Sequence, residues 1–418
     1  MTMTTKTAPE IRIFDYDTYA EGDPTTFGLP LEQYRHLRDE EPCYLQEFDD
    51  PMLIDRAWVV SRNEDIWEVD RNTELYAADR GFVNIWRVVP IDPMNGGMPA
   101  MLTTDGERHR GQRHVLAKGF TPGFVRKLEG KFRRYAKEVV DDALEKGTFN
   151  FVHTIAHNMP MEALGDVLGV PKEDRPKFFG WVDKFAAPFD TRITASFDEV
   201  MEAIGNLMVY AEELAEFKRT NPADDVMSRL VASGEGGDPL MSAEEIMGNV
   251  ALLASGAAES TRTAMSHGMH ELMRNEEAMA WMRAHQDNLP PTVIQEMVRI
   301  ASPFTHLVRT ATRDHELHGK QIKEGDIVAM LFAAGNFDER AFDRPEEFRP
   351  DRIENPHVSF GRGAHKCLGQ HVAALEMKVL FEELFQRTSS IEPAGPITYV
   401  RDAYSRGVYE LPVTVTPA

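Results

Sequence analysis

The sequence predicts a mostly α-helical protein with a minor β part. Four long segments carry apolar residues at three- and four-residue spacing, which is the pattern of helices with one buried face. These segments are 124–147, 197–219, 243–274 and 290–301. Three short segments have the apolar and β-branched composition of strands. They are 57–60, 327–331 and 409–415.

The ends of two of these helices are marked by their residue types. The first segment finishes at Gly147, and glycine commonly follows the last turn of a helix. Ser242 precedes the third segment as an N-cap, and Glu244 and Glu245 add negative charge to its first turn. A helix over 243–274 is far longer than the average of about 11–12 residues. Its apolar and small residues indicate that it crosses the core.

The charge and the cysteine content exclude several classes of protein. Lys plus Arg number 46 and Asp plus Glu number 68, which gives a formal net charge of −22. Nucleic-acid binding needs a basic surface, so we expect no nucleic-acid partner. The chain has 2 cysteines, Cys43 and Cys367, too few for a disulfide framework, a four-cysteine zinc site or a four-cysteine iron–sulfur cluster. Any function of a cysteine therefore depends on a single thiolate.

The chain shows no targeting or membrane segment. Residues 1–10 have no apolar stretch after a basic start, so we expect a flexible N-terminal tail and no signal peptide. No run of about 18 apolar residues is present, so we expect no membrane partner. Together with the few cysteines, this favours the reducing cytoplasm. No long linker divides the chain, and we predict a single domain over 1–418.

The segment 360–369 around Cys367 is the sharpest feature of the sequence. It reads FGRGAHKCLG and is followed by a helical pattern from 370 to 386. Glycines around one cysteine allow the backbone to approach a flat group closely. A thiolate in front of a helix is stabilised by backbone N–H groups and by the helix dipole. The plainer interpretation is a small buried cysteine in a tight turn.

This segment resembles the heme-binding segment of the cytochrome P450 superfamily, the heme-thiolate monooxygenases. The resemblance implies that Cys367 is the axial ligand of a heme b iron, where an anionic sulfur favours O–O cleavage. It also implies a single, triangular, mostly α domain with the heme between the long central helix and the cysteine loop. Four more loop residues are expected beside the heme: Phe360, Gly361, His365 and Gly369.

A second motif of the family would support the heme pocket. Glu296 and Arg299 match its ExxR helix, and residues three apart on a helix can pair. By resemblance this pair is structural rather than catalytic. The family often adds an arginine from a later segment, at a position where this chain has Glu347. Arg349 and Arg352 are the two alternatives for this third partner.

Four donors are expected at the heme propionates. His109 and Arg113 resemble the family's HxxxR helix and lie four residues apart, on one helical face. Arg309 and His365 occupy positions where the family places further donors. Cationic and polar groups facing two carboxylates would stabilise a buried dianion through charge-assisted hydrogen bonds. Taken singly, each of them is more typical of a protein surface.

The long helix carries the pattern that the family uses for oxygen chemistry. Glu259 stands in the acid position and Ser260 in the alcohol position. Such a helix can open, admit a water and relay protons to the oxygen being activated. Ala257, which by resemblance lies against the heme, replaces a common glycine, and Ser260 lacks the methyl group that fixes the rotamer of the usual threonine. Thr261 is the alternative hydroxyl, and a plain polar notch in the helix is the simpler interpretation.

The substrate is expected to be a small lipophilic molecule. Where the family lines its pocket, this chain is largely apolar and aromatic. The residues expected there are Val88, Val89, Phe185, Ala254, Ala258, Phe304, Leu307 and Val408. By analogy with similar bacterial proteins, the expected class is a terpenoid, a steroid or an aromatic compound.

Electrons are expected from a separate protein, because no glycine-rich nucleotide motif follows a strand. Nine Lys or Arg and one acid, Glu129, lie between Arg108 and Arg134, and Arg362 and Lys366 flank the cysteine. A basic surface there would steer an acidic redox protein, although a solvated helix face is the simpler interpretation. By resemblance we expect a [2Fe–2S] ferredoxin with a NAD(P)H-dependent reductase, and O2 as co-substrate.

The sequence thus predicts a monooxygenase that inserts one oxygen atom into a C–H bond, with Glu259 and Ser260 as its proton relay. A peroxide-using or rearranging enzyme on the same fold is the first alternative, and turnover with peroxide alone would favour it. A heme sensor without turnover is the second, and Glu259→Gln would then leave its function unchanged. A helical scaffold without heme is the third, and a colourless purified protein would favour it.

Overall fold

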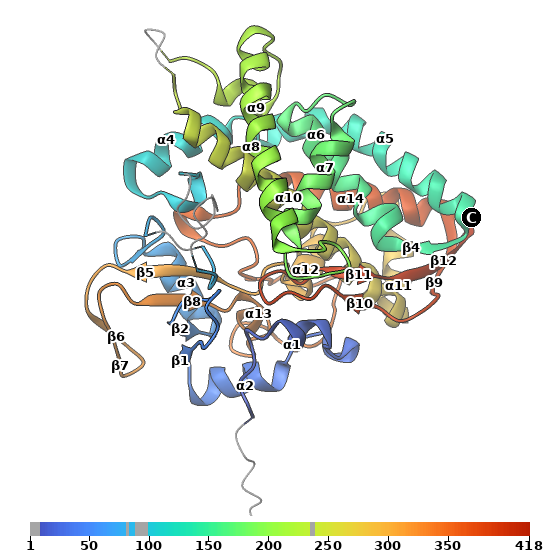
Figure 1. The fold of residues 1–418 in the computed structure, drawn as a ribbon. Helices are drawn as coiled ribbons and strands as arrows, with labels where there is room; N and C mark the ends of the chain where they lie inside the picture. The colour runs from blue at the N-terminus through green and yellow to red at the C-terminus, as the bar shows by residue number, and fades with distance from the viewer. Residues whose placement is uncertain (1–8, 81–82, 88–98, 235–238) are drawn as a thin grey trace, which may run out of the picture.

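The structure, a computed structural model, describes residues 9–80, 83–87, 99–234 and 239–418. Within these residues helices predominate, and strands form four small sheets (Figure 1). The helices are α1 (Tyr16–Ala20), α2 (Leu31–Glu40), α3 (Asn63–Arg71), α4 (Gly106–Ala117), α5 (Pro122–Lys146), α6 (Asn158–Leu168), α7 (Arg175–Ala186), α8 (Phe197–Thr220), α9 (Val226–Leu230), α10 (Ala243–Arg274), α11 (Glu276–His285), α12 (Pro291–Ala301), α13 (Phe332–Gly335) and α14 (Gln370–Arg387). The strands are β1 (Cys43–Glu47), β2 (Arg56–Val60), β3 (Tyr76–Ala77), β4 (Thr148–Asn150), β5 (Leu307–Ala311), β6 (His315–Leu317), β7 (Lys320–Ile322), β8 (Ile327–Met330), β9 (Thr388–Pro393), β10 (Thr398–Tyr399), β11 (Val408–Glu410) and β12 (Pro412–Pro417).

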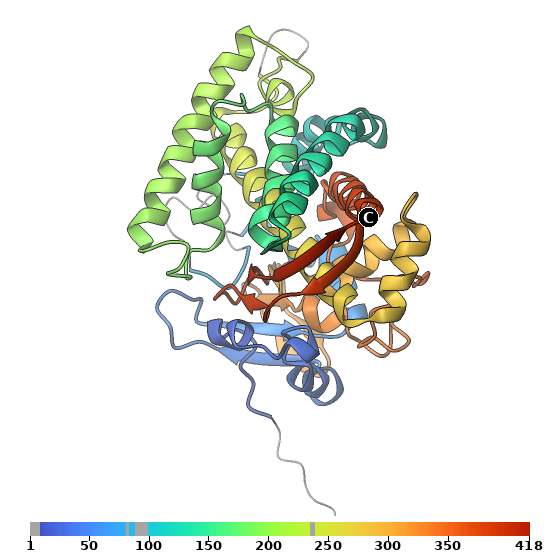
Figure 2. The same ribbon diagram turned by 90° about the vertical axis from the view of Figure 1, so that its right-hand side faces the viewer.

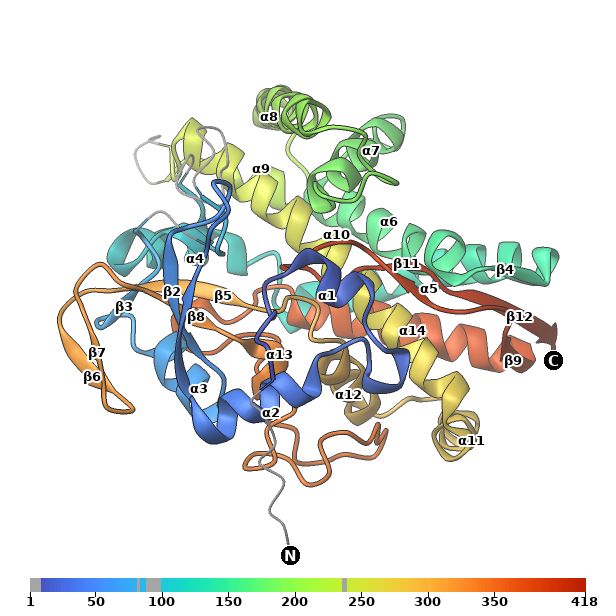
Figure 3. The same cartoon turned by 60° about the horizontal axis from the view of Figure 1, so that its bottom comes forward.

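The long helix α10 runs through the middle of the molecule (Figure 3). Its bounds are those that the sequence pattern predicts. It begins after Ser242, whose hydroxyl accepts from the N–H of Glu245 at 3.2 Å, while the Glu245 carboxylate accepts from the N–H of Ser242 at 3.0 Å. This reciprocal cap satisfies two donors that would otherwise lack partners. Helices α6, α8 and α12 pack on α10, so its middle is buried and can carry the residues of an internal site.

The largest sheet has the strand order β1-β2-β8-β5-β3. Strands β2 and β8 are parallel, and the other neighbours are antiparallel. A three-stranded sheet has the order β4-β12-β9. The predicted strand over 409–415 is in fact two strands, β11 and β12, separated at Leu411. They separate because β11 pairs with β10, whereas β12 pairs with β4 and β9.

Apolar side chains from both kinds of element form one large core and a smaller core at the largest sheet. Figure 2 shows α1 and α2 on one side of the molecule and α7 and α8 on the opposite side. Cys43 is buried in the smaller core, which fits an inert structural cysteine. Among the described residues, no helix is both long and apolar enough to span a membrane. The tail predicted over 1–10 lies mostly outside the described residues.

Candidate active site

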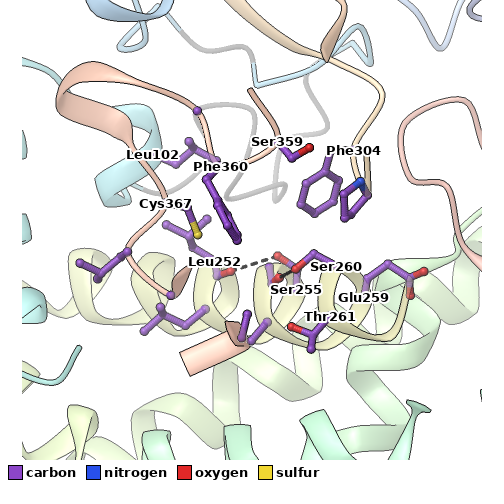
Figure 4. A pocket seen from close by; sticks show the side chains of 18 of the residues that line it. Leu102, Leu252, Ser255, Glu259, Ser260, Thr261, Phe304, Ser359, Phe360 and Cys367 are labelled. Carbon is purple, nitrogen blue, oxygen red and sulfur yellow. Dashed lines mark hydrogen bonds between the residues drawn. The ribbon is translucent and has the colours of Figure 1, made fainter. Parts of the chain in front are cut away.

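The cysteine loop, residues 360–369, folds tightly in front of α14. Gly361 and Gly363 both have a φ of +63°, a conformation that side chains disfavour. A Cβ on Gly363 would lie 2.8 Å from the Cα of Arg71, so this position also needs glycine for space. The N–H of Cys367 donates to the carbonyl at the start of the loop at 2.7 Å. The loop thereby holds Cys367 at the wall of a large internal cavity (Figure 4).

The surroundings of the Cys367 sulfur contain donors for an anion. Burial raises the pKa of the thiol, while the N–H groups of Gly369 and Gln370 and the charge of Arg113 act in the opposite direction. A cation coordinated by the sulfur would offset the cost of burying a thiolate. The site therefore suits a single-thiolate metal ligand, which is the role that the sequence predicts for Cys367.

The four predicted propionate donors converge beside the loop from separate elements. His109 and Arg113 lie on α4, Arg309 on β5 and His365 within the loop. The rings of His109 and His365 are 4.3 Å apart between centroids, and Arg113 donates to the Lys366 carbonyl at 2.7 Å. His109 Nε2 and Arg309 Nε are buried without a hydrogen-bond partner in the described part of the chain. Burying such atoms without a hydrogen-bond partner costs free energy, and carboxylates placed beside them would accept or share those hydrogen bonds.

Sequence reasoning missed two carboxylates among these donors. Asp70 accepts from Arg309 at 2.7 Å and from the N–H of Arg362 at 2.5 Å. Asp105, which directly precedes α4, lies 3.0 Å from His365 Nε2. Acids favour the start of a helix, so the position of Asp105 was a usable signal, whereas the sequence around Asp70 contains none. Both acids orient the donors toward the loop.

The middle of α10 borders the same cavity. Ala257, Glu259, Ser260 and Thr261 all line it (Figure 4). The Ser260 hydroxyl donates to the carbonyl of Gly256 at 2.6 Å. Side chains that bond back to the preceding turn bend helices, so this contact favours an irregularity where the sequence predicts one. The structure brings both candidate hydroxyls, Ser260 and Thr261, to the cavity.

The carboxylate of Glu259 is buried and belongs to a network that leads toward solvent. It pairs with Arg262 and accepts from the Thr263 hydroxyl at 3.2 Å. Arg262 also donates to Asp183 at 3.1 Å, and the Asp183 side chain is 28% exposed. The acid thus lies between the cavity and solvent, where a carboxylate can exchange protons with both.

Glu296 and Arg299 face each other as the sequence pattern suggests. Two hydrogen bonds of 2.8 Å join them, and neither side chain is exposed. Arg352 Nε lies 3.1 Å from both carboxylate oxygens of Glu296, whereas Arg349 contributes only its backbone N–H at 3.0 Å. Arg352 is therefore the third side chain of the cluster. Burial raises the pKa of Glu296, but the two arginines outweigh it, so that the pKa is lowered and the acid stays ionised.

The cavity wall contains only some of the predicted substrate contacts. Phe185, Phe304 and Leu307 line it. Ala254 and Ala258 are instead packed in the core, because the 100° turn per helical residue places them away from Gly256 and Ser260. Val408 is likewise buried in the core, within β11. Val88 and Val89 lie outside the described residues. Further lining residues that the sequence analysis did not name are Met101, Leu102, Phe120, Leu164, Leu252 and Leu253.

The basic segment between Arg108 and Arg134 is largely neutralised by acids from other elements. Its ion pairs are Arg108–Glu245 at 2.9 Å, Lys127–Asp224 at 3.2 Å, Lys131–Asp166 at 3.3 Å and Arg133–Glu382 at 3.0 Å. In the described residues, Lys118, Arg126 and Lys366 form no such pair. The positive surface is therefore smaller than the sequence count indicates.

Comparisons with known proteins agree with this geometry. Residues 92–393 match the family model described as Cytochrome P450. A steroid C26-monooxygenase of Rhodococcus jostii is 32% identical over 409 residues, which cover 96% of this chain and 83% of that protein. A methyl-branched lipid omega-hydroxylase of Mycobacterium tuberculosis is 33% identical over 319 residues, 75% of this chain and 74% of that protein. A cytochrome P450 of Mycobacterium marinum in complex with pseudoionone has a TM-score of 0.89 at 29% identity, covering 98% of this chain and 100% of that chain.

The predicted fold class, enzyme class and cofactor are confirmed together. Iron protoporphyrin IX needs one axial ligand, a flat apolar slot and donors for two carboxylates. Cys367, the glycine loop, and the unpartnered nitrogens of His109 and Arg309 fit these needs. The chain belongs to the cytochrome P450 family of heme b proteins and is a P450 monooxygenase.

Proposed function

We propose that this P450 inserts one oxygen atom from O2 into a C–H bond of a steroid or another lipid, with electrons from a separate ferredoxin. The observation that carries the proposal is that Cys367, Glu259 and Ser260 border one cavity. A heme sensor has no use for a buried acid that is linked to solvent, and a rearranging enzyme consumes no protons from one.

When bound, heme supplies a thiolate-ligated iron that binds O2 and activates it. The chain supplies the protons. Glu259 takes up a proton on the solvent side, near Asp183, and passes it inward by rotating away from Arg262. The Ser260 hydroxyl donates to the Gly256 carbonyl and can therefore accept a hydrogen bond from a water on the cavity side, which it would hold in place to carry the proton onward.

The substrate class is supported by the relatives and by the cavity wall. The relatives are named for steroids and methyl-branched lipids. Phe185, Phe304 and Leu307 give this chain a wall that binds apolar surface. Such a wall favours a lipophilic substrate, whether its carbon skeleton is that of a steroid or of a branched lipid.

For electron delivery we propose a [2Fe–2S] ferredoxin, reduced by a NAD(P)H-dependent reductase, that docks over the cysteine loop. Lys366 is next to Cys367, and Lys118 directly follows α4, whose Arg113 contacts the Lys366 carbonyl. Lys118, Arg126 and Lys366, the basic surface, have no carboxylate partner in the described residues. Unpaired cations steer an acidic partner.

The test begins with the visible difference spectrum of the dithionite-reduced protein with and without carbon monoxide. A strongly red-shifted Soret band is expected from thiolate ligation. Turnover under 18O2 with ferredoxin, reductase and NADPH should then place one labelled oxygen in the product. Glu259→Gln is the matched variant and should lower the product rate while keeping the carbon monoxide band. Product formation with hydrogen peroxide but not with ferredoxin would contradict the proposal, as would an unchanged rate in Glu259→Gln.

A further inference from the structure

Arg262 on α10 connects the buried Glu259 to a histidine that the proposed proton route does not include. One terminal nitrogen of its guanidinium pairs with Glu259. The other lies 3.1 Å from Asp183 Oδ1 and 3.1 Å from His157 Nδ1. Arg262 Nε is buried and has no hydrogen-bond partner in the described part of the chain, so the two terminal nitrogens hold the guanidinium in place.

The contact with Arg262 fixes the protonation state of the His157 ring. A guanidinium has hydrogen-bond donors and no acceptor, so His157 Nδ1 must accept, and the ring is neutral with its proton on Nε2. Burial lowers the pKa of His157 from the ordinary value of 6.5, and the charge of Arg262 lowers it further, against the opposing charge of Asp183. His157 is therefore an acceptor at neutral pH.

An acceptor at this position matters when Glu259 moves. Figure 4 shows the Glu259 carboxylate pointing away from Cys367, so the side chain must turn before it passes a proton into the cavity. When it turns, Arg262 loses its partner on that side. A buried cation that is short of acceptors costs free energy. Asp183 and the neutral ring of His157 continue to hold the guanidinium, and they thereby stabilise the state in which Glu259 is free.

Protonation of His157 would have the opposite effect. His157 Nδ1 lies 3.5 Å from Asp183 Oδ1, so an imidazolium would donate to Asp183 and repel Arg262. Arg262 would then depend more on Glu259, and the turning of Glu259 would become harder. A fall in pH through the pKa of His157 should therefore slow the transfer of protons to the cavity.

The surroundings of His157 contain few other charges. The charged and titratable groups that act on its pKa come from α7, α10 and the preceding turn: Asp183, Arg262, Glu259 and His153. Three further elements pack on that turn, Val152–Ala156. Helix α5 buries an apolar face, β4 carries no charged residue, and β11 presents Tyr409, whose ring lies 6.1 Å from that of His153.

We propose that His157 is a positioning residue for proton delivery, which in its neutral form accepts a hydrogen bond from Arg262 and so allows Glu259 to turn toward the cavity. This inference rests on the proposed function and adds a residue to it. It predicts an acid limb in the pH profile of the product rate that belongs to His157.

The test compares two substitutions of His157. In His157→Asn the amide oxygen can accept near the position of Nδ1 but does not titrate. This variant should keep the parent rate at pH 8, and the parent rate divided by its rate should fall between pH 8 and pH 5. Titration of Asp402, which interacts with Glu259, is common to both proteins and cancels in this ratio. His157→Leu removes the acceptor and should lower the product rate at pH 8 about tenfold.

His153→Asn is the matched control, because His153 is an exposed histidine in the turn before His157. The parent rate divided by the rate of this variant should stay constant with pH. A constant ratio for His157→Asn as well, or a parent rate in His157→Leu, would overturn the inference.

A second readout does not depend on turnover. Carbon-13 NMR of the histidine rings in the ferrous carbon monoxide form gives the pKa of His157, from the signal that is absent in His157→Asn. This pKa should lie below 6.5 and should rise in Arg262→Gln, which removes a cation beside the ring. An unchanged pKa would overturn the inference. Failure of the proposed function is distinguishable, since the parent protein would then form no product with ferredoxin while the NMR titration still tests the contact.

Discussion

The two sides of the cavity differ in chemical character: the side of Cys367 is polar and tightly bonded, and the side of Phe304 is aromatic and apolar. On the cysteine side, two glycines at positive φ and the buried Glu296–Arg299 pair hold polar groups tightly, while nitrogens of His109 and Arg309 have no partner in the described residues. The opposite wall, formed by Trp86, Phe304 and Tyr404 and named the aromatic wall, consists of packed rings: Tyr404 stacks on Phe304 with centroids 5.0 Å apart and lies 5.7 Å from Trp86. The difference indicates a division of labour. The side that holds a permanent cofactor presents polar groups fixed by tight backbone and ion-pair contacts, whereas the side that meets a substrate presents apolar rings.

The largest expected effect is the loss of stability on the cysteine side caused by Arg299→Ala. It leaves the fully buried Glu296 carboxylate without its bidentate partner, and removing one member of such a pair costs about 3–5 kcal/mol. We expect this loss in the free energy of unfolding by urea, together with a lower heme content. Arg352→Ala is the control and should cost less, because Arg299 still makes both of its bonds to the carboxylate. Equal losses in the two variants would show that the pair is not the centre of the cluster.

The contrast also explains what the sequence could predict. Short sequence motifs predict the cysteine side, because its requirements are local. The loop needs glycine at position 363, and the ion pair joins two residues three apart on one helix. The 243–274 helix was predictable for the same reason, from its cap and periodicity. The role of Asp70 was not predictable, because Asp70 lies 239 residues from its partner Arg309 in the sequence and no local pattern indicates the contact.

The substrate side of the cavity was predictable only in part, because Phe304 lines it as expected whereas Ala254 and Ala258 do not. Ala254 and Ala258 have the composition of a pocket helix, yet helical rotation decides which small residues border the cavity. Ser405 lines the cavity only because the chain after β10 is bridged to Phe304. Sequence composition gives the apolar character of this wall, whereas its polar atoms depend on tertiary contacts.

A second prediction sharpens the comparison at Asp402, a buried acid behind the aromatic wall. Burial raises the pKa of Asp402 to about 7 from the ordinary value of 3.8, against the opposing N–H groups of Tyr404 and Ser405 and the Ser405 hydroxyl. The folded state therefore binds this proton more tightly than the unfolded chain, and stability falls as pH rises from about 4 to 7. The free energy of unfolding of Asp402→Asn, relative to the parent, should rise by about 2 kcal/mol between pH 5 and pH 8. A difference that stays constant with pH would mean that Asp402 is already ionised at pH 5.

A third prediction separates the two hydroxyls of α10, which lies between the two sides. Ser260→Ala removes the hydroxyl that bonds to the Gly256 carbonyl and should raise the share of NADPH lost as hydrogen peroxide several-fold. Thr261→Ala is the matched control and should change this share little. The measurement is product and peroxide formed per NADPH consumed. The reverse outcome would assign the relay to Thr261.

The smallest expected effect concerns the outer face of the cysteine side. Lys118→Glu and Arg126→Glu reverse two charges of the basic surface that have no carboxylate partner among the described residues, and each should slow reduction by ferredoxin about two- to fivefold at low salt. The effect should vanish at high salt, because exposed charges are screened within about 10 Å at 0.1 M. Lys127→Glu is the control, since Lys127 is already paired with Asp224 at 3.2 Å. Stopped-flow reduction rates at several salt concentrations measure this directly. If Lys127→Glu slows reduction as much as the other two variants do, the paired cations also attract ferredoxin. The ion pairs within the segment 108–134 would then not reduce its attraction for ferredoxin.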